Sequence, residues 1–345
     1  MSPTIFMIFI SSLSTGTIIT MTSHHWLAAW IGLELNTLAI IPIISTTHNP
    51  RSTEAATKYF LIQAAASAVI LFSSMTNAWL TGTWDITNLL SPHSQVMLTL
   101  ALAMKLGLAP AHFWLPEVLQ GSTLTTALVI TTWQKLAPMA LIYLTLNNLS
   151  TTVLIMLGIL SSMIGGWGGL NQTQTRKIMA YSSIAHLGWM ITISSIMTNI
   201  MIFNLLIYLI MTTALFCFLI TTKSKTIQDT TTTWTLSPMM TTMMMMLLLS
   251  LGGLPPLTGF TPKWLILEEL VNQNLITMAT IMAMSALLSL FFYLRLTYTT
   301  TITLSPNTLQ TKFKWRFKPN LPASLMTILS TMSILLLPMT PLNLL

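Results

Sequence analysis

Hydrophobic segments of about 20 residues follow one another along almost the whole chain, and this spacing constrains the fold more than any other feature. A helix needs about 20 apolar residues to cross the hydrocarbon core of a bilayer. Of the 345 residues, 53% are hydrophobic and 6% are charged, whereas a soluble domain carries about 25% charged residues. The sequence therefore predicts an all-α polytopic membrane protein, with a single transmembrane domain over residues 1–345.

The lengths of the apolar segments predict about eleven transmembrane helices. In chain order, they cover residues 3–22, 25–46, 56–80, 95–120, 123–146, 150–170, 175–197, 200–222, 237–270, 275–299 and 322–341. The fourth and ninth segments are long, and Pro and Gly residues interrupt both. The interruptions read "GLAPAHFWLPE" at 107–117 and "GGLPPLTGFTPKWLILEE" at 252–269.

The positive charges gather in loops on one side of the predicted membrane. Ten of the 14 Lys and Arg residues are Arg51, Lys58, Arg176, Lys177, Lys223 and Lys225, together with Lys312, Lys314, Arg316 and Lys318 of a basic loop at 300–320. Loops on the matrix or cytoplasmic side carry such an excess. We therefore expect the N-terminus on that side and the C-terminus on the opposite side. Membrane orientation explains the formal charge of +7 better than nucleic-acid binding does.

The two interrupted segments occupy matching positions in two sets of five helices, 3–146 and 150–299. Since five is an odd number, the second set is inverted relative to the first, and the helix at 322–341 follows both. Inverted repeats with matching broken helices indicate an ion or substrate site near the midplane of the membrane. Pro and Gly are also commoner in membrane helices in general, but that alone does not explain two matching breaks beside lysines.

When the charges of the loops and helix ends are set aside, four charged residues remain inside the predicted helices: Glu34, Lys105, Lys135 and Lys263. Each costs at least a few kcal/mol in hydrocarbon, so each is expected to face protein or water and to have a partner. A buried lysine or glutamate can exchange a proton with ordered water, which favours a proton relay. A structural ion pair is the alternative for Glu34, and Lys263 could instead extend to the membrane interface.

Two histidines are secondary candidates for such a relay. His112 follows Pro110, where a broken helix frees carbonyl groups and leaves room for water. His186 lies in "YSSIAHLGWM" at 181–190, a polar stripe on an apolar helix. Histidine titrates near neutral pH, although a histidine inside a membrane can equally well be a packing residue. Glu117, Glu268 and Glu269 are expected at the solvated ends of the broken helices.

Other chemistry is not expected. The chain has one cysteine, Cys217, so neither a disulfide framework nor metal ligation by several cysteines is predicted. We find no phosphate-binding loop, dinucleotide fingerprint or spaced Cys/His set in the sequence. The first fifty residues contain no Lys or Arg, and a secretory or transit peptide is therefore not expected.

Four segments carry a resemblance to a known family: "NPRSTEAATKYFLIQAAAS" (49–67), "MKLGLAPAHFWLPEV" (104–118), "GGLNQTQTRKIMAYSSIAHLGWM" (168–190) and "LSLGGLPPLTGFTPKWL" (249–265). They resemble NADH dehydrogenase subunit 2, one of the antiporter-like membrane subunits of mitochondrial respiratory complex I, in its animal form. The resemblance runs along the whole chain. Most relatives have three further helices at the start, and this sequence lacks them.

The resemblance implies a location in the mitochondrial inner membrane, with the N-terminus in the matrix and the C-terminus in the intermembrane space. It implies a core subunit of an NADH:ubiquinone reductase that translocates protons but performs no redox chemistry on this chain. NADH, FMN, iron–sulfur clusters and ubiquinone would be bound by other subunits. The implied partners are the other core and accessory subunits of the membrane arm, and cardiolipin.

The resemblance also gives roles to individual residues. Glu34 matches the essential glutamate of the family, paired with the lysine that Lys105 matches. Lys135 matches the central connecting lysine, Lys263 the terminal lysine, and His186 a histidine of the hydrophilic axis. Two other functions stay open on the sequence: a stand-alone cation/proton antiporter, and a structural subunit of the membrane arm without its own proton path.

Overall fold

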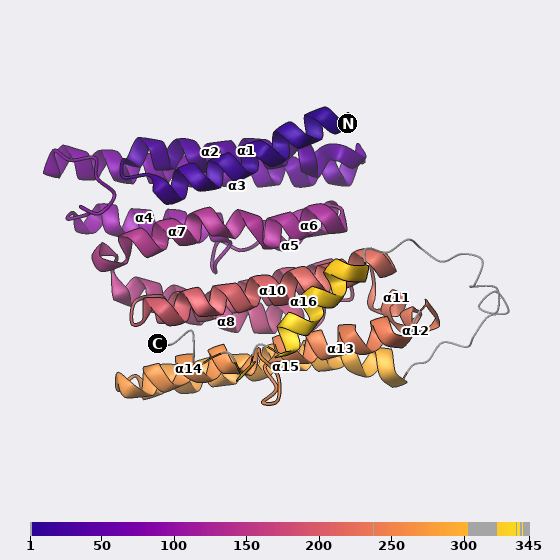
Figure 1. The fold of residues 1–345 in the computed structure, drawn as a ribbon. Helices are drawn as coiled ribbons and strands as arrows, with labels where there is room; N and C mark the ends of the chain where they lie inside the picture. Colours follow the sequence, from indigo (N-terminus) through magenta and orange to yellow (C-terminus); the bar gives the residue numbers. More distant parts are fainter. Residues whose placement is uncertain (1, 237, 303–322, 336, 339, 341–345) are drawn as a thin grey trace. The chain divides into compact units, whose positions relative to one another are not determined.

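The computed structural model describes residues 2–236, 238–302, 323–335, 337–338 and 340, which form helices joined by loops (Figure 1). Contacts within the chain define two compact units. Unit 1 consists of Met1–Ser161 and Leu187–Thr198, and unit 2 consists of Ser162–His186 and Asn199–Leu345. The basic residues Lys312, Lys314, Arg316 and Lys318 lie outside the described residues.

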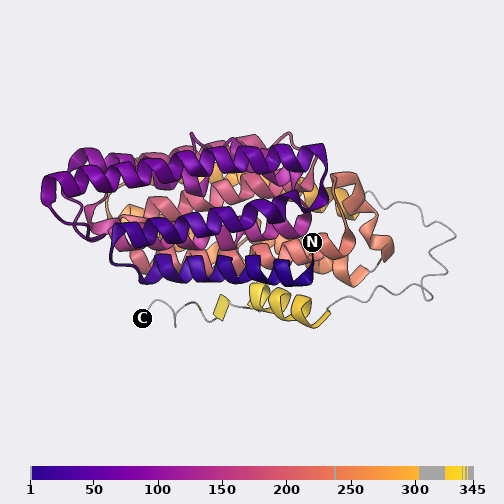
Figure 2. The ribbon, with the colours of Figure 1, turned by 90° about the horizontal axis from the view of Figure 1, so that it is seen from above.

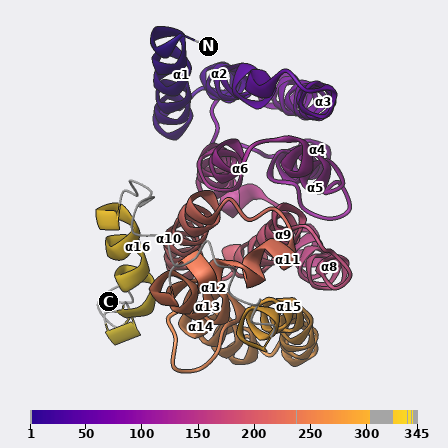
Figure 3. The ribbon, with the colours of Figure 1, turned by 90° about the vertical axis from the view of Figure 1, so that its right-hand side faces the viewer.

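Unit 1 contains seven complete α-helices and three short 3₁₀ helices. They are α1 (Pro3–Thr22), α2 (Trp26–Ile44), η1 (Ser45–Thr47), α3 (Pro50–Thr81), α4 (Pro92–Leu106), α5 (Trp114–Gly121), α6 (Leu124–Thr131), η2 (Trp133–Lys135), α7 (Leu136–Thr145) and η3 (Leu146–Asn148). Helix α3 packs against α2, α4 and α5, and Figure 3 shows α2 and α3 side by side. Helices α8 (Thr151–Gly169) and α9 (Thr175–Ser194) contribute residues to both units.

Unit 2 continues with α10 (Thr198–Thr222), α11 (Ile227–Thr231), α12 (Thr233–Leu236), α13 (Pro238–Gly252), α14 (Phe260–Asn272), α15 (Ile276–Ile302) and α16 (Ala323–Leu335). Helix α15 packs against α11, α13 and α14, and α13 also contacts α16, the yellow helix of Figure 2. The short helices α11 and α12 follow the predicted span at 200–222 and were not expected from the sequence.

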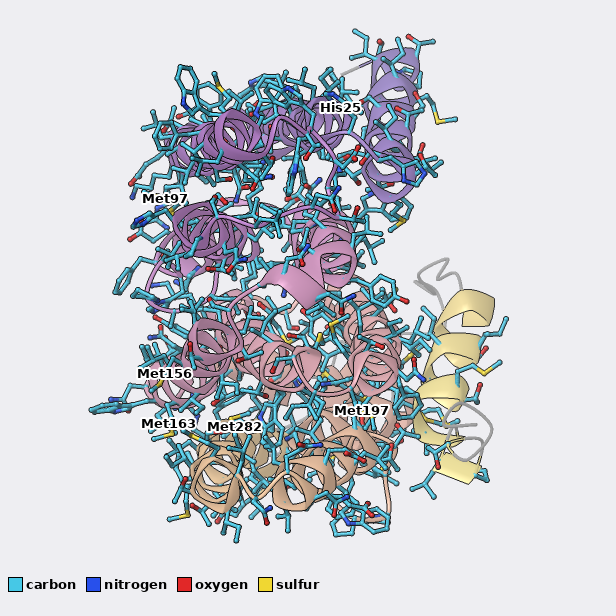
Figure 4. All side chains as sticks on the ribbon, turned by 90° about the vertical axis from the view of Figure 1, so that its left-hand side faces the viewer. His25, Met97, Met156, Met163, Met197 and Met282 are labelled. Atoms are coloured by element: carbon cyan, nitrogen blue, oxygen red, sulfur yellow. The ribbon has the colours of Figure 1, made fainter. Side chains whose placement is uncertain are left out.

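Seven helices of the described residues are long and apolar enough to cross a membrane. They are α1, α2 with η1, α3, the segment from α6 to η3, α8, α10 and α15. These helices and their neighbours carry large apolar side chains on their outer faces. Met97 on α4 and Met156 on α8 are labelled in Figure 4, and their exposed fractions are 42% and 58%. Such faces suit contact with lipid or with other membrane helices.

Helix α3 begins six residues before the predicted span at 56–80, because the sequence before it stabilises a helix N-terminus. Pro50 occupies the first helical position, where its missing N–H group costs nothing. The Ser52 hydroxyl accepts a hydrogen bond of 3.1 Å from the backbone N–H of Asn49. The polar first turns of α3 therefore belong to the same helix as its apolar part.

The first predicted break lies between α4 and α5. Helix α4 ends at Leu106, and the next residue, Gly107, has a φ of 78° in the left-handed region that favours glycine. Two side chains bind the last carbonyl groups of α4: Trp114 Nε1 donates to the Met104 carbonyl at 3.1 Å, and Gln63 Nε2 donates to the Lys105 carbonyl at 3.4 Å. The Gln63 bond satisfies a backbone carbonyl that would otherwise be unpaired in an apolar environment, and the Trp114 bond adds to the bond of 3.2 Å that the Met104 carbonyl accepts from the Gly107 N–H.

The second predicted break lies between α13 and α14, and the chain folds tightly there. Gly253 has a φ of 82°. A Cβ atom placed on Gly259, just before α14, would lie 1.7 Å from the Ser250 carbonyl oxygen of α13. Only a residue without a side chain fits this approach. The tight loop brings the start of α14 against the end of α13.

The segment predicted at 123–146 contains a third break, which was not expected. Helices α6 and α7 are separated by the 3₁₀ turn η2, where the Lys135 N–H bonds to the Thr132 carbonyl at 3.3 Å. Pro138 has no N–H group, so it cannot bond to the carbonyl of Gln134 four residues earlier. A short 3₁₀ stretch inside a helix often marks a functional position. Here it carries Lys135.

The close approach at Gly259 gives a testable prediction about the second break. Gly259→Ala should destabilise the break, because the new methyl group meets backbone rather than a side chain that could rotate away. In the matched control, Gly252→Ala, the nearest atom to the new Cβ lies 3.8 Å away. We expect the midpoint of thermal denaturation of the assembled protein to fall for Gly259→Ala only. Equal midpoints for the two variants would contradict this packing.

The bond from Trp114 gives a second prediction. Trp114→Phe keeps the aromatic ring but removes the N–H donor, and the Met104 carbonyl is left without it. The carbonyl keeps its bond of 3.2 Å from the Gly107 N–H, so the loss of one hydrogen bond should lower stability by about 0.5–1.5 kcal/mol. Trp167→Phe, at a tryptophan with an exposed fraction of 75%, serves as the control. A Trp114→Phe protein as stable as that control would show that this bond does not maintain the first break.

Candidate functional site

A polar cavity lies inside unit 1, among helices that carry the predicted relay residues. Its polar lining comes from Asn36, Thr37, Tyr59, Gln63, Lys105, Gln134 and Lys135. The cavity offers about 20 Å³ to the centres of water molecules, and about 10–15 Å³ of such space is enough for one water. It is bordered by the first break, which ends α4, and by the third break, which precedes α7.

Lys105 lies in the last turn of α4 and faces this cavity. Its exposed fraction is 5%. Its Nζ atom is buried and has no hydrogen-bond partner among the described residues. The Glu34 carboxylate is close enough to act electrostatically on Lys105. The two predicted partners form neither an ion pair nor a direct hydrogen bond in this structure.

Glu34 connects to the cavity through Thr37, one helical turn further along α2. The Thr37 hydroxyl lies 3.0 Å from the Glu34 Oε2 atom and 2.9 Å from the Glu34 carbonyl oxygen, and it donates in both contacts. The charge of Glu34 also acts on Tyr59 of α3, another residue of the cavity lining. Glu34 is therefore one residue removed from the polar space that Lys105 faces.

Lys135 lies in η2 and lines the same cavity as Lys105. Its exposed fraction is 4%. Because the helix is interrupted at η2, the lysine is held at a point where the backbone hydrogen-bond pattern changes. The structure thus gathers three of the four predicted ionisable residues around one polar space of unit 1: Lys105 and Lys135 at its wall, and Glu34 behind Thr37.

Lys263 belongs to unit 2 and has a different environment. It lies in the first turn of α14, with an exposed fraction of 8%. Its Nζ atom donates to the Gly252 carbonyl at 2.9 Å and approaches the Leu251 carbonyl at 3.5 Å. Both carbonyls are at the C-terminus of α13, where the helix dipole favours a positive charge. Lys263 is therefore buried rather than extended toward an interface.

The lysines of the two predicted breaks are placed differently. Lys105 precedes its break, in the last turn of α4, and its Nζ atom does not bind the carbonyls that the break frees. Lys263 follows its break and reaches back across it to the preceding half-helix. The matching positions seen in the sequence thus lead to two distinct local arrangements.

The two histidines are buried but lie apart from the cavity lining. His112 is in the segment between α4 and α5, with an exposed fraction of 3%, and its Nδ1 atom lies 3.2 Å from the Pro110 carbonyl oxygen. His186 of α9 has an exposed fraction of 7% and packs against Tyr208, with ring centroids 5.6 Å apart. His112 thus lies beside a backbone carbonyl, and His186 packs against an aromatic ring.

The acidic residues near the ends of the broken helices lie at the surface. Glu117 and Glu268 are exposed, as expected for helix ends, whereas Glu269 is partly buried. Glu117 also forms an ion pair: Lys58 Nζ lies 2.7 Å from Glu117 Oε2 and 2.5 Å from Glu54 Oε1. This exposed cluster joins the first turns of α3 to α5, the half-helix that follows the first break.

Several residues of the cavity were not singled out in the sequence, chiefly Asn36, Tyr59, Gln63 and Gln134. The sequence does contain a feature that could have identified them. Each is a polar residue inside an apolar segment, and Asn36 and Thr37 lie two and three residues after Glu34. What the sequence did not indicate is that side chains from α2, α3, α4 and η2 converge on one space.

Groups that could bind a metal ion were also sought. Within the residues that the structure describes, no cluster of three or more His, Cys, Asp and Glu side chains has a geometry that could hold a metal. Cys217 is a free, partly buried cysteine.

Comparison with known proteins identifies the family. Residues 23–289 match the family described as NADH:quinone oxidoreductase/Mrp antiporter, TM, and residues 290–344 match the NADH dehydrogenase subunit 2 C-terminus. The fold is similar to that of a chain of respiratory complex I from Thermus thermophilus with bound aureothin, with a TM-score of 0.87 and 25% sequence identity. That alignment covers 97% of this chain and 79% of the other.

Curated relatives match over their full length. NADH-ubiquinone oxidoreductase chain 2 of Varanus timorensis is 57% identical over 342 residues, which cover 99% of each chain. The protein of the same name from Xenopus laevis is 55% identical over 344 residues, which cover 100% of each chain. Two family models that together span nearly the whole sequence, and relatives of this similarity, lead to one conclusion: the chain belongs to the NADH-ubiquinone oxidoreductase chain 2 family of antiporter-like membrane proteins.

Proposed function

We propose that this chain is a proton-translocating, antiporter-like core subunit in the membrane arm of respiratory complex I. The observation that carries the proposal is the shared polar cavity of unit 1, which brings the buried Lys105 and Lys135 to one space beside Glu34. Buried charges inside a membrane protein are expensive and mark ion or proton pathways. Membership of the family supports the same activity.

The proposed mechanism moves protons among Glu34, Lys105, Lys135 and Lys263. Each lysine can hold a proton as an ammonium group or release it to an adjacent acceptor as an amine. A change in the interaction between Glu34 and Lys105 alters how strongly Lys105 holds its proton, and this drives transfer toward Lys135. In unit 2, Lys263 receives and releases protons beside the carbonyls of α13. His112 and His186 are secondary members of the relay.

The proposed membrane topology follows from the pattern of apolar segments. About eleven spans form two inverted repeats of five helices each, 3–146 and 150–299, followed by the helix at 322–341. The excess of Lys and Arg on one side orients the N-terminus toward the matrix and the C-terminus toward the intermembrane space. The breaks between α4 and α5 and between α13 and α14 support this division, because each falls in the fourth helix of its set.

The proposed setting is the mitochondrial inner membrane. The other core and accessory subunits of the membrane arm are the partners, and cardiolipin is the proposed lipid. NADH oxidation and ubiquinone reduction take place on other subunits, which bind NADH, FMN, iron–sulfur clusters and ubiquinone. This chain contributes the proton path that is coupled to that electron transfer.

Lys135→Met tests the relay. Methionine fills a similar volume but cannot bind a proton, so we expect assembly to continue and proton translocation to be lost. The measurement is the number of protons translocated per NADH oxidised in inner-membrane vesicles that carry the intact complex. Lys58→Met is the control, because Lys58 is partly exposed in its surface cluster and has no place in the relay.

Normal pumping by the Lys135→Met complex at a full rate of electron transfer would refute the relay. Such a result would instead favour a structural subunit, in which the buried charges serve assembly.

Complex membership is tested separately. After mild detergent extraction and native electrophoresis, we expect this chain to migrate in one large band that oxidises NADH. A small band without that activity would contradict the proposal and favour a stand-alone cation/proton antiporter. The purified chain would then exchange cations for protons in liposomes.

A further inference from the structure

Three side chains at the cavity of unit 1 carry buried polar atoms without hydrogen-bond partners among the described residues. These atoms are Lys105 Nζ, Gln134 Nε2 and Asn36 Nδ2. Leaving a buried donor or acceptor unsatisfied destabilises a protein. Several such atoms at one polar space therefore indicate that the space supplies a partner.

The size of the cavity identifies that partner as water. Its 20 Å³ of space for water centres suits one or two water molecules, and a buried water needs two to four polar neighbours. The unpaired groups are mostly N–H donors, which require an acceptor. A water oxygen accepts two hydrogen bonds while its own hydrogens remain free to donate.

The Gln134 side chain is oriented so that its amide N–H group can donate a hydrogen bond to this water. It lies in the middle of η2, directly before Lys135. Its Oε1 atom faces the Tyr59 hydroxyl at 3.5 Å, so the opposite end of the amide, Nε2, is the buried and unpaired one. The third helix break thus places a fixed donor beside both lysines of the cavity.

We propose that this cavity binds one or two water molecules and that Gln134 is a positioning residue for proton transfer between Lys105 and Lys135. In the transfer, the Lys105 ammonium gives a proton to the water oxygen, and the same water gives another proton to the neutral amine of Lys135. Lys105 becomes an amine, Lys135 becomes an ammonium, and the water is unchanged. The Gln134 N–H group donates to the water oxygen and orients it. This inference deepens the proposed function and rests on it.

The water is tested by determining the structure of the assembled complex at a resolution that shows buried waters. We expect density within hydrogen-bond distance of both Gln134 Nε2 and Lys105 Nζ. A map that resolves other buried waters in this chain but shows none at the cavity would overturn the inference.

The role of Gln134 is tested in the same assembled complex with two variants. Gln134→Met removes the donor, and misplacing the water should slow coupled NADH oxidation roughly ten- to a hundredfold. Gln134→Glu keeps the shape and retains an O–H donor only when the carboxyl group is protonated. Its coupled rate should therefore rise as the pH falls, relative to the unchanged protein, which a purely structural role of Gln134 would not produce.

Gln228→Met is the matched control, since Gln228 is exposed on α11 and the chemical change is the same. Native electrophoresis of each variant measures how much complex assembles, and rates are expressed per assembled complex.

The outcomes separate this inference from the proposed function. If Lys135→Met abolishes pumping while Gln134→Met pumps at the normal rate, the relay stands and the role of Gln134 is refuted. If Lys135→Met pumps normally, the proposed function fails, and the transfer step fails with it. A slow Gln134→Met complex and a pH-dependent Gln134→Glu complex, together with the water density, would establish the inference.

Discussion

The need to satisfy every polar group in an apolar environment shapes this structure more than any other constraint. In hydrocarbon, an unpaired backbone carbonyl costs several kcal/mol, so a broken helix must provide substitutes where it breaks. At the end of α4 the substitutes are the side chains of Trp114 and Gln63. At the end of α13 the substitute is Lys263. The breaks that open the interior to polar chemistry are thus the places where side chains replace the backbone as hydrogen-bond donors.

The same constraint explains why the ionisable residues are where they are. A lysine in a continuous apolar helix would face lipid or pack against apolar side chains, and both are unfavourable. Lys105, Lys135 and Lys263 each lie within a few residues of an interruption, where the local density of polar groups is higher. The helix breaks and the buried charges therefore form one structural feature rather than two.

Much of this arrangement could be predicted from the sequence, because hydropathy and helix-breaking residues act locally. The helix at 3–22 and the breaks after Leu106 and Gly252 are where Pro, Gly and apolar length indicate. The turn at η2 was missed, since one proline at position 138 inside an apolar run also fits a kinked but continuous helix. The cavity was missed for a different reason: it depends on contacts between α2, α3, α4 and η2, which no single segment encodes.

The contact between Lys263 and the end of α13 makes the junction between two half-helices depend on the charge of one side chain. Its ammonium group joins two half-helices that the backbone does not connect by helical hydrogen bonds, and a charged donor binds carbonyl oxygens more strongly than a neutral amine does. The conformational freedom of α14 relative to α13 is therefore tied thermodynamically to the charge of one side chain. Loss of the Lys263 proton would weaken the bond to the Gly252 carbonyl and loosen the junction between the two half-helices.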